Sequence, residues 1–368
     1  MKNELRVVIS GGGTGGHIFP AVAIANEIKA QKPEAKILFV GALGKMEMEK
    51  VPKAGYEIIG LPIAGFNRSN MLANVTFPFK LLRSLFLAHK VLRGFKPDIA
   101  IGVGGFASGP TLRVANLLGI KTLIQEQNSY AGVTNKILSK KAEKVCVAYP
   151  NMEKFFEKDK IVFTGNPVRG DLAKISISPY EAKKSFGLEP DRKTLLIIGG
   201  SLGALSINKG IASGLKNLLN ADLQIIWQTG KTFVEQAKET VANLQSQRVY
   251  VSDFIYEMDK AYAAADLVVS RAGALSVSEL SLVGKAAILV PYPFAAEDHQ
   301  TQNALSLTSK EAAILVKDNE IADHLVESVV ELAENATKLR VLSENILKFA
   351  KPFAAKEIVD EIFKITQK

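Results

Sequence analysis

The chain has a single cysteine among its 368 residues, Cys146, which lies within an apolar run. One cysteine excludes an internal disulfide and is typical of proteins from reducing compartments. A small hydrophobic side chain buried in the core is therefore the simplest interpretation of Cys146.

Patterns typical of metal sites and of membrane-spanning helices are also missing. The sequence has no Asp-x-Asp and only four histidines, which are widely spaced, so we expect no metal site and no metal cofactor. No apolar run reaches the roughly 20 residues of a transmembrane helix. Residues 1–6 lead directly into the first apolar run, and we expect no signal peptide.

Negative charge is absent from residues 58–97, which hold six Lys and Arg residues of a chain whose formal net charge is +9. Residues 77–93 have leucines and phenylalanines at helical spacing between these cations. An ordinary packed helix explains part of the pattern, but the lack of acids favours a face that rests on anionic lipid. A nucleic-acid groove is the poorer explanation, because the charges alternate with aliphatic residues. The candidate membrane residues are Phe77, Phe79, Lys80, Leu82, Arg83, Phe86, Lys90 and Arg93.

Short apolar runs alternate with helical patterns along the whole chain, which predicts parallel sheets covered by helices on both faces. The predicted strands are residues 7–10, 37–41, 99–103, 122–125, 144–148, 194–198, 223–228, 248–251, 267–270 and 287–290. The pattern restarts near Thr194 after a polar stretch. We therefore predict two doubly wound α/β domains, residues 1–165 and 166–350, with residues 351–368 crossing back to the first.

Four glycine-containing turns follow predicted strands, at residues 11–16, 102–109, 199–203 and 270–274. Ligands of open α/β sheets bind beyond the carboxyl ends of strands, and glycine lets the backbone approach a bound anion. Two turns in each predicted domain therefore indicate a ligand cleft between the domains.

The first turn satisfies G-x-G-x-x-G, the pattern of dinucleotide-binding proteins. The second predicted strand, however, ends in Gly41 and Ala42 instead of the acidic residue that would hold a ribose. A P-loop is also excluded, because His17 stands where that motif requires Lys.

The ordered set of motifs resembles the MurG family of peripheral membrane N-acetylglucosaminyltransferases. The matching segments are residues 11–17, 104–110, 126–128, 165–169, 199–204, 270–279 and 293–300. The resemblance implies a GT-B fold, two Rossmann-like domains with an interdomain cleft. It also implies inverting transfer of N-acetylglucosamine from UDP to an undecaprenyl-pyrophosphate-linked muramoyl pentapeptide in peptidoglycan synthesis. The family works on the cytoplasmic face of the bacterial inner membrane, near other cell-wall synthesis proteins.

The resemblance also implies site residues. Glu279 would hold the ribose of UDP, and Ile255 would read the uracil edge through its backbone. The other donor-binding candidates are Thr14, Gly15, Gly16, Asn128, Arg169, Ser201, Ala274, Leu275 and Gln300. For Glu279 the alternative is a solvated helix charge, and Ser201, which we expect at a helix start, could be a plain N-cap. Leu202 replaces the family's commoner glutamine, and Thr301 replaces a second glutamine beside Gln300.

His17 is the candidate general base, because an imidazole titrates near the operating pH and follows the first glycine turn. The alternative is a histidine that only hydrogen-bonds the substrate or caps the loop. The acceptor pyrophosphate is expected at Gly13, His17, Gly104, Gly105 and Ser108.

Three other functions remain open from the sequence. The first is another UDP-sugar enzyme, such as a glycosyltransferase with a soluble acceptor or an epimerase. The second is a nicotinamide-dependent oxidoreductase, and the third is a non-catalytic membrane-docking protein.

Overall fold

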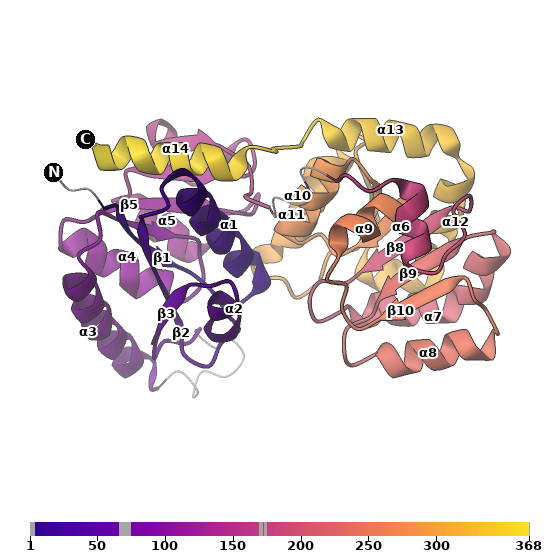
Figure 1. Cartoon of the computed structure of the whole chain (residues 1–368), viewed down its shortest axis with the longest axis horizontal. Helices are drawn as coiled ribbons and strands as arrows, with labels where there is room; N and C mark the ends of the chain where they lie inside the picture. Colours follow the sequence, from indigo (N-terminus) through magenta and orange to yellow (C-terminus); the bar gives the residue numbers. More distant parts are fainter. Residues whose placement is uncertain (1–3, 66–74, 169–171, 173–174, 368) are drawn as a thin grey trace. The chain divides into compact units, whose positions relative to one another are not determined.

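The computed structural model describes residues 4–65, 75–168, 172 and 175–367, and the chain divides into two compact units (Figure 1). Unit 1 comprises Met1–Val168 and Phe353–Lys368, and unit 2 comprises Arg169–Pro352. The boundaries expected from the sequence lie two or three residues earlier, at residues 165 and 350.

Unit 1 is built on a seven-stranded parallel sheet in the order β3-β2-β1-β4-β5-β6-β7. Its strands are β1 (Arg6–Ser10), β2 (Lys36–Ala42), β3 (Glu57–Leu61), β4 (Ile99–Gly102), β5 (Lys121–Glu126), β6 (Lys144–Val147) and β7 (Ile161–Phe163). The chain first winds from β1 to β2 and β3 on one side. It then returns to place β4 on the other side of β1, so the winding reverses between β1 and β4.

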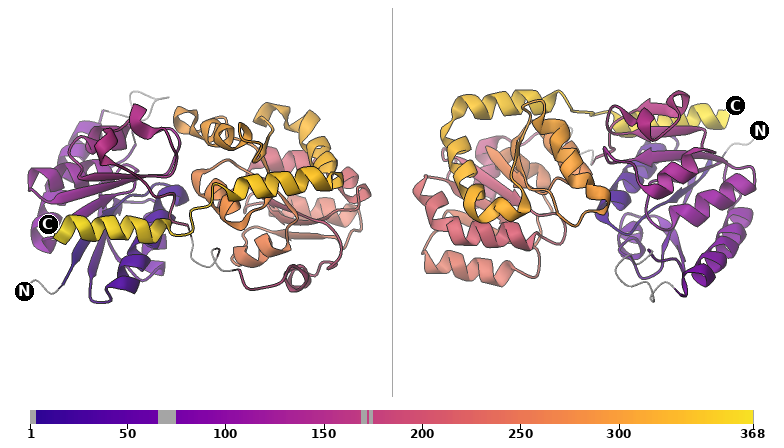
Figure 2. Two further views of the ribbon diagram at one scale, coloured as in Figure 1. Left: turned by 90° about the horizontal axis from the view of Figure 1, so that it is seen from above. Right: turned by 180° about the vertical axis from the view of Figure 1, so that it is seen from behind.

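Helices cover both faces of this sheet. One face carries α1 (Gly15–Gln31), α2 (Glu47–Lys53) and the final helix α14 (Ala354–Gln367), which shares a buried core with α1 and the strands. Both views of Figure 2 show α14, in yellow, alongside unit 1. The other face carries α3 (Phe77–Phe95), α4 (Ser108–Leu117) and α5 (Val133–Ser139).

Unit 2 repeats this design with a six-stranded parallel sheet in the order β10-β9-β8-β11-β12-β13. Its strands are β8 (Thr194–Ile198), β9 (Gln224–Gln228), β10 (Val249–Ser252), β11 (Leu267–Ser270), β12 (Ala286–Leu289) and β13 (Ile314–Leu315). Its helices are α6 (Pro179–Ser185), α7 (Leu205–Asn220), α8 (Val234–Asn243), α9 (Met258–Ala264), α10 (Ala274–Val283), α11 (His299–Thr308), α12 (Val326–Glu334) and α13 (Ala336–Leu347). The winding reverses between β8 and β11.

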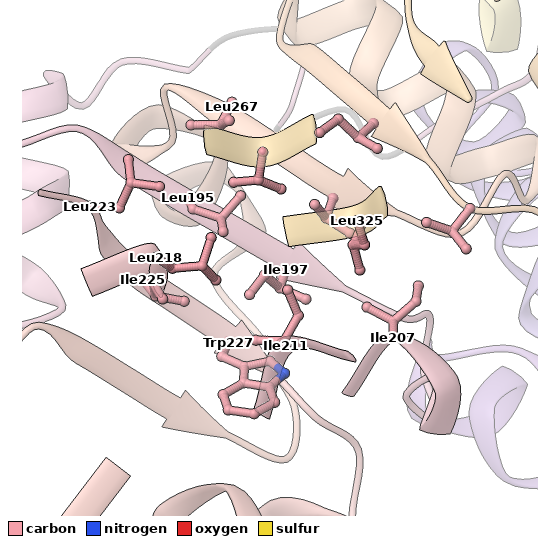
Figure 3. Close-up of a cluster of buried hydrophobic side chains, with 14 of the residues drawn as sticks. Leu195, Ile197, Ile207, Ile211, Leu218, Leu223, Ile225, Trp227, Leu267 and Leu325 are labelled. Atoms are coloured by element: carbon pink, nitrogen blue, oxygen red, sulfur yellow. The ribbon is translucent and has the colours of Figure 1, made fainter. Parts of the chain in front are cut away.

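The core of unit 2 lies between this sheet and α7, and Figure 3 shows its side chains. Ile207, Ile211 and Leu218 of α7 meet Leu195, Ile197 and Ile225 of the central strands. Trp227 of β9 is fully buried beside them, and its indole N–H donates to the side-chain oxygen of Asn208 at 3.0 Å. The one polar atom of this large ring is therefore satisfied inside the core.

The fold class expected from the sequence is confirmed, and each of the ten predicted strands is present. The strands β3, β7 and β13 were not predicted. All three are edge strands and are only partly buried, so they lack the long apolar run of a central parallel strand.

Two further expectations are confirmed. The helix expected over residues 77–93 is α3, and Cys146 is a fully buried free cysteine of β6. Burial raises the pKa of the Cys146 thiol, because the apolar surroundings disfavour the thiolate. Of the helices that the structure describes, none has the length and apolar character needed to span a bilayer.

The packing of α14 gives a stability prediction. The side chain of Ile362 is fully buried in the core of unit 1. Ile362→Ala should therefore lower the free energy of unfolding by about 2–5 kcal/mol. Urea denaturation followed by circular dichroism measures this. Gln367→Ala, at an exposed position of the same helix, should leave the midpoint unchanged. Equal effects of the two changes would show that α14 adds no core packing.

Candidate active site

In each unit, two of the predicted glycine loops flank the point where the winding reverses. In unit 1 these are residues 11–17 after β1 and residues 103–108 after β4. In unit 2 they are residues 199–204 after β8 and residues 271–274 after β11. The carboxyl edge at such a reversal is where doubly wound sheets bind their ligands. Each unit therefore has one candidate ligand site of its own.

His17 lies in the first turn of α1 and is half-buried. Its Nδ1 is 2.9 Å from the carbonyl oxygen of Gly12 and 3.4 Å from the hydroxyl of Thr14. A carbonyl oxygen can only accept, so the shorter contact requires the ring proton on Nδ1. The neutral imidazole then carries its lone pair on Nε2, the atom that a general base uses to take a proton.

The loop after β4 approaches the imidazole closely. A Cβ atom on Gly104, whose φ is +93°, would lie 2.8 Å from Nε2 of His17. A Cβ atom on Gly105 would lie 2.3 Å from the carbonyl oxygen of Gly12. Only glycine permits these contacts, and the structure thus brings together three of the predicted residues, His17, Gly104 and Gly105.

Ser108 helps to hold the loops after β1 and β4 together. Its side chain is fully buried, and its hydroxyl lies 2.6 Å from the carbonyl oxygen of Ser10 and 2.9 Å from that of Gly104. The hydroxyl therefore links the ends of β1 and β4. Its expected contact with an acceptor pyrophosphate stays a prediction.

Glu47 was not among the sequence-predicted residues. This first residue of α2 is 1% exposed, and its carboxylate accepts the N–H of Gly13 at 2.8 Å and that of Ala42 at 2.9 Å. The dinucleotide-binding pattern has an acidic residue at the end of the second strand, where this chain has Gly41 and Ala42. The acidic residue of this chain is Glu47, five residues after Ala42, and its carboxylate faces the first glycine loop. The turn between β2 and α2 decides this position of the carboxylate.

A second buried carboxylate holds the loop that contains Asn128. Glu126 is 2% exposed and accepts the N–H groups of Asn128 at 3.1 Å and Gly132 at 3.0 Å. It also accepts the side-chain N–H of Asn135 at 2.9 Å. Asn128 is half-buried at the carboxyl end of β5, and its role toward the donor stays a prediction.

Near the end of unit 1, Asn166 belongs to a buried network of side-chain amides. The side-chain oxygen of Asn166 accepts from Gln125 at 3.0 Å, and its amide nitrogen donates to the carbonyl oxygen of Gln127 at 3.0 Å. These bonds tie the end of unit 1 to β5. Arg169, a predicted donor contact, lies outside the described residues.

In unit 2, Glu279 lies on α10, as the motif predicts, and is half-buried. Its Oε2 accepts the hydroxyl of Tyr262 at 3.0 Å, and Tyr262 of α9 is fully buried. Ala274 and Leu275 begin the same helix. Sequence reasoning missed Tyr262, because an isolated tyrosine in an apolar helix carries no signal of its partner.

The expectation that Ser201 begins a helix is wrong. The helix α7 begins at Leu205 with Ala204 as its N-cap, and Ser201 is exposed in the preceding turn. Gly203 closes that turn with an N–H bond to Gly200 and a φ of +77°. A Cβ atom on Gly203 would lie 2.0 Å from the carbonyl oxygen of Thr229, so this turn must be completed before the helix starts.

The other donor candidates of unit 2 lie on two further loops. Ile255 is 5% exposed and follows β10, so its side chain belongs to the core. Gln300 lies in the first turn of α11, and its side-chain oxygen accepts the N–H of Tyr292 at 2.9 Å. The donor roles of both residues stay predictions.

Arg271 is a further residue that was not among the sequence-predicted site residues. Its guanidinium is 9% exposed and donates to Asp318 at 2.5 Å, to Ser206 at 2.7 Å and to the carbonyl oxygens of Val290 and Pro291. These partners come from segments after β12 and β13 and from α7. The buried cation thus joins several segments at the edge where the unit 2 loops meet.

Within the described part of the chain, there is no group of three or more His, Cys, Asp and Glu side chains that could hold a metal ion.

Comparison with known proteins identifies the family. Residues 7–147 match the glycosyltransferase family 28 N-terminal domain, and residues 194–360 match the glycosyltransferase family 28 C-terminal domain. The chain belongs to glycosyltransferase family 28.

Relatives within family 28 match over the full length. A protein of Phocaeicola vulgatus is 56% identical over 100% of this chain and 98% of its own length. One of Porphyromonas gingivalis is 55% identical with the same coverage. Both are named UDP-N-acetylglucosamine–N-acetylmuramyl-(pentapeptide) pyrophosphoryl-undecaprenol N-acetylglucosamine transferase.

A solved structure agrees with these relatives. The crystal structure of Acinetobacter baumannii MurG has a TM-score of 0.79 and 33% identity, covering 98% of this chain and 99% of that chain. The resemblance to the MurG family that was drawn from the sequence is confirmed, and so are the GT-B fold and the glycosyltransferase class.

The contact between Tyr262 and Glu279 gives a prediction. Tyr262→Phe removes a buried hydroxyl that donates to a carboxylate, and should lower the free energy of unfolding by about 1.5–3 kcal/mol. Thermal denaturation measures the change. Tyr180→Phe removes a hydroxyl from a half-exposed residue of the same unit and should have no measurable effect. Indistinguishable melting curves for the two variants would contradict the assigned bond.

Proposed function

We propose that this chain transfers N-acetylglucosamine from UDP-N-acetylglucosamine to undecaprenyl-pyrophosphoryl-N-acetylmuramoyl pentapeptide, with inversion at the anomeric carbon. The product is the disaccharide-linked lipid precursor of peptidoglycan. The observation that carries the proposal is the position of His17, whose Nε2 lone pair lies beside the loop after β4. The full-length similarity to proteins named for this reaction supports it.

His17 acts as the general base in this proposal. Its Nε2 takes the proton from the muramoyl hydroxyl while the hydroxyl oxygen attacks C1 of N-acetylglucosamine. The bond between C1 and the β-phosphate oxygen breaks, and its electron pair leaves with UDP. Attack from the side opposite the leaving group inverts the anomeric centre.

Unit 2 holds the donor. Glu279, held by Tyr262, accepts the two ribose hydroxyls, since a carboxylate can accept two hydrogen bonds at once. The backbone of Ile255 reads the uracil edge, and Gln300 contacts the sugar. The charge on the departing UDP is met by Ser201, by Arg169 and by N–H groups at the start of α10, so the proposal needs no metal or other cofactor.

Unit 1 holds the acceptor. The loop of Gly104 and Gly105, together with His17 and Ser108, is the seat assigned to its pyrophosphate, whereas Thr14, Gly15 and Gly16 at the start of α1 are assigned to the donor. The N–H of Gly13, also expected at the pyrophosphate, donates to Glu47. Contact of that amide with a pyrophosphate would require it to exchange partners.

The exposed face of α3 docks the protein on anionic lipid. Phe79, Leu82 and Phe86 follow one another at helical spacing and are 74%, 65% and 70% exposed. Ser84, Ala88 and Leu92 occupy the buried face of the same helix. The exposed cations that flank the apolar stripe are Lys80, Arg83, Lys90 and Arg93, whereas Phe77 is half-buried. Each cation adds roughly 1 kcal/mol of attraction near an anionic surface.

This face supports peripheral attachment at the cytoplasmic side of the inner membrane, where the lipid-linked acceptor is presented. The other part of the basic stretch, which includes Arg68, lies outside the described residues.

A transfer assay tests the reaction. Radiolabelled UDP-N-acetylglucosamine and the lipid-linked muramoyl acceptor should give label in the lipid phase. His17→Asn should lower kcat by about 100-fold or more, because it removes the base, with little change in the KM of the donor. Glu279→Ala should raise that KM by about tenfold or more.

Glu327→Ala, an exposed acid of α12, is the matched control and should behave as the unaltered protein. Absence of label in the lipid phase would refute the proposed acceptor. A kcat of His17→Asn near that of the unaltered protein would remove His17 from the role of base.

Flotation with phosphatidylglycerol vesicles tests the docking face. Replacing Phe79, Leu82 and Phe86 together by Ser should weaken vesicle binding by about tenfold or more, since each buried side chain contributes roughly 1.5–3 kcal/mol. Phe353→Ser, at another exposed phenylalanine of unit 1, should bind as before. Equal binding by both variants would rule out α3 as the docking face.

A further inference from the structure

We propose that Glu47 is a positioning residue that acts on His17 through a single peptide group. Its carboxylate holds the imidazole in the tautomer with a proton on Nδ1 and makes Nε2 more basic. The inference rests on the proposed role of His17 as base, and it deepens that role by naming the group that prepares the imidazole.

The connecting group is the peptide between Gly12 and Gly13. Its N–H, on Gly13, donates to Oε2 of Glu47 at 2.8 Å, and its carbonyl oxygen, on Gly12, accepts from Nδ1 of His17 at 2.9 Å. The two bonds lie on opposite sides of one planar, conjugated amide. Carboxylate, peptide and imidazole therefore form one continuous hydrogen-bonded chain.

Hydrogen bonds in such a chain strengthen one another. A carboxylate that draws on the N–H increases the negative charge on the carbonyl oxygen of the same peptide. That oxygen becomes a better acceptor for Nδ1–H, which favours this tautomer and stabilises the imidazolium formed when Nε2 takes a proton. Because Glu47 is 1% exposed, water screens the effect little.

The surroundings of Glu47 are shaped to hold its carboxylate. Both oxygens accept backbone N–H groups, from Gly13 and Ala42, which suits the acceptor-only ionised form. A Cβ atom on Gly12 would lie 2.2 Å from the carboxylate, and one on Gly41 would lie 2.6 Å from Cγ of Glu47. Gly12 in the loop after β1 and Gly41 within β2 thus make room for this side chain.

The hydrogen bond between Gly13 and Glu47 also limits which backbone N–H groups can bind an anion. An amide already bound to a carboxylate, with that negative charge beside it, is a poor place for a pyrophosphate. The Gly12–Gly13 peptide therefore serves the imidazole, and the N–H groups at the start of α1 remain for the substrate.

The test compares Glu47→Gln with the unaltered protein labelled with 15N-histidine. Only four imidazoles contribute signals, and His17→Asn identifies the one of interest. In the unaltered protein we expect the Nδ1–H tautomer of His17 to predominate. In Glu47→Gln the side-chain amide must set its NH2 group against one of the two backbone N–H donors. We expect a mixture of tautomers and a lower pKa of His17, by about half a unit or more.

In the transfer assay, Glu47→Gln should lower kcat by about tenfold or more and leave the KM of the donor unchanged, since unit 2 is untouched. Glu49→Gln is the matched control, because it removes the same charge from an exposed position of the same helix. It should leave tautomer, pKa and kcat as they are. Glu47→Asp, which keeps the charge but withdraws it by one methylene, should give an intermediate tautomer ratio and serves if Glu47→Gln does not fold.

The outcomes separate the two proposals. If Glu47→Gln leaves the tautomer and the pKa of His17 unchanged, Glu47 only braces the loop and the inference fails. If they change while kcat stays the same, the coupling stands and the role of His17 as base fails. The spectra need no substrate, so they are independent of the transfer reaction.

Discussion

The candidate site of unit 1 depends on the close approach of two backbones, the loops after β1 and β4. Gly105 lies so near the carbonyl oxygen of Gly12 that no side chain fits between them, and a Cβ atom on Gly104 would collide with the imidazole of His17. The reversal of winding brings the two strands side by side. Because Gly104 and Gly105 have no side chains, the two loops can come into contact, and the imidazole of His17 lies where they do so.

Buried polar groups that the reaction would not consume hold these loops in place. Glu47 and Glu126 accept backbone N–H groups of loops in unit 1. In unit 2, Arg271 donates to carbonyl oxygens of the loop after β12, and Tyr262 holds the carboxylate of Glu279 on α10. A buried carboxylate or guanidinium is costly unless its hydrogen bonds are made, so each fixes its loop in one arrangement. The groups that would contact substrate thus lie on glycine-rich loops. Buried side chains that do not contact the substrate fix the conformation of these loops.

The sequence predicted best where a local pattern and the final structure obey the same rule. Apolar runs such as residues 194–198 became central strands, and the α3 pattern became a helix with one apolar exposed stripe. Prediction failed where a distant contact decides. Ser201 was placed at a helix start, but packing of Gly203 against Thr229 delays α7 to Leu205. Glu47 was overlooked because its partners are backbone amides, which leave no mark in the sequence.

By itself the sequence determined the alternation of strands and helices, the glycine loops after the strands, the basic and apolar stretch of α3 and the family. All of these are written in residue type and spacing along the chain. Only the tertiary structure decided which loops lie side by side, that Nδ1 of His17 donates to Gly12, and that a buried carboxylate reaches the other side of the same peptide. Those contacts depend on strand order and on backbone groups that are the same in every residue.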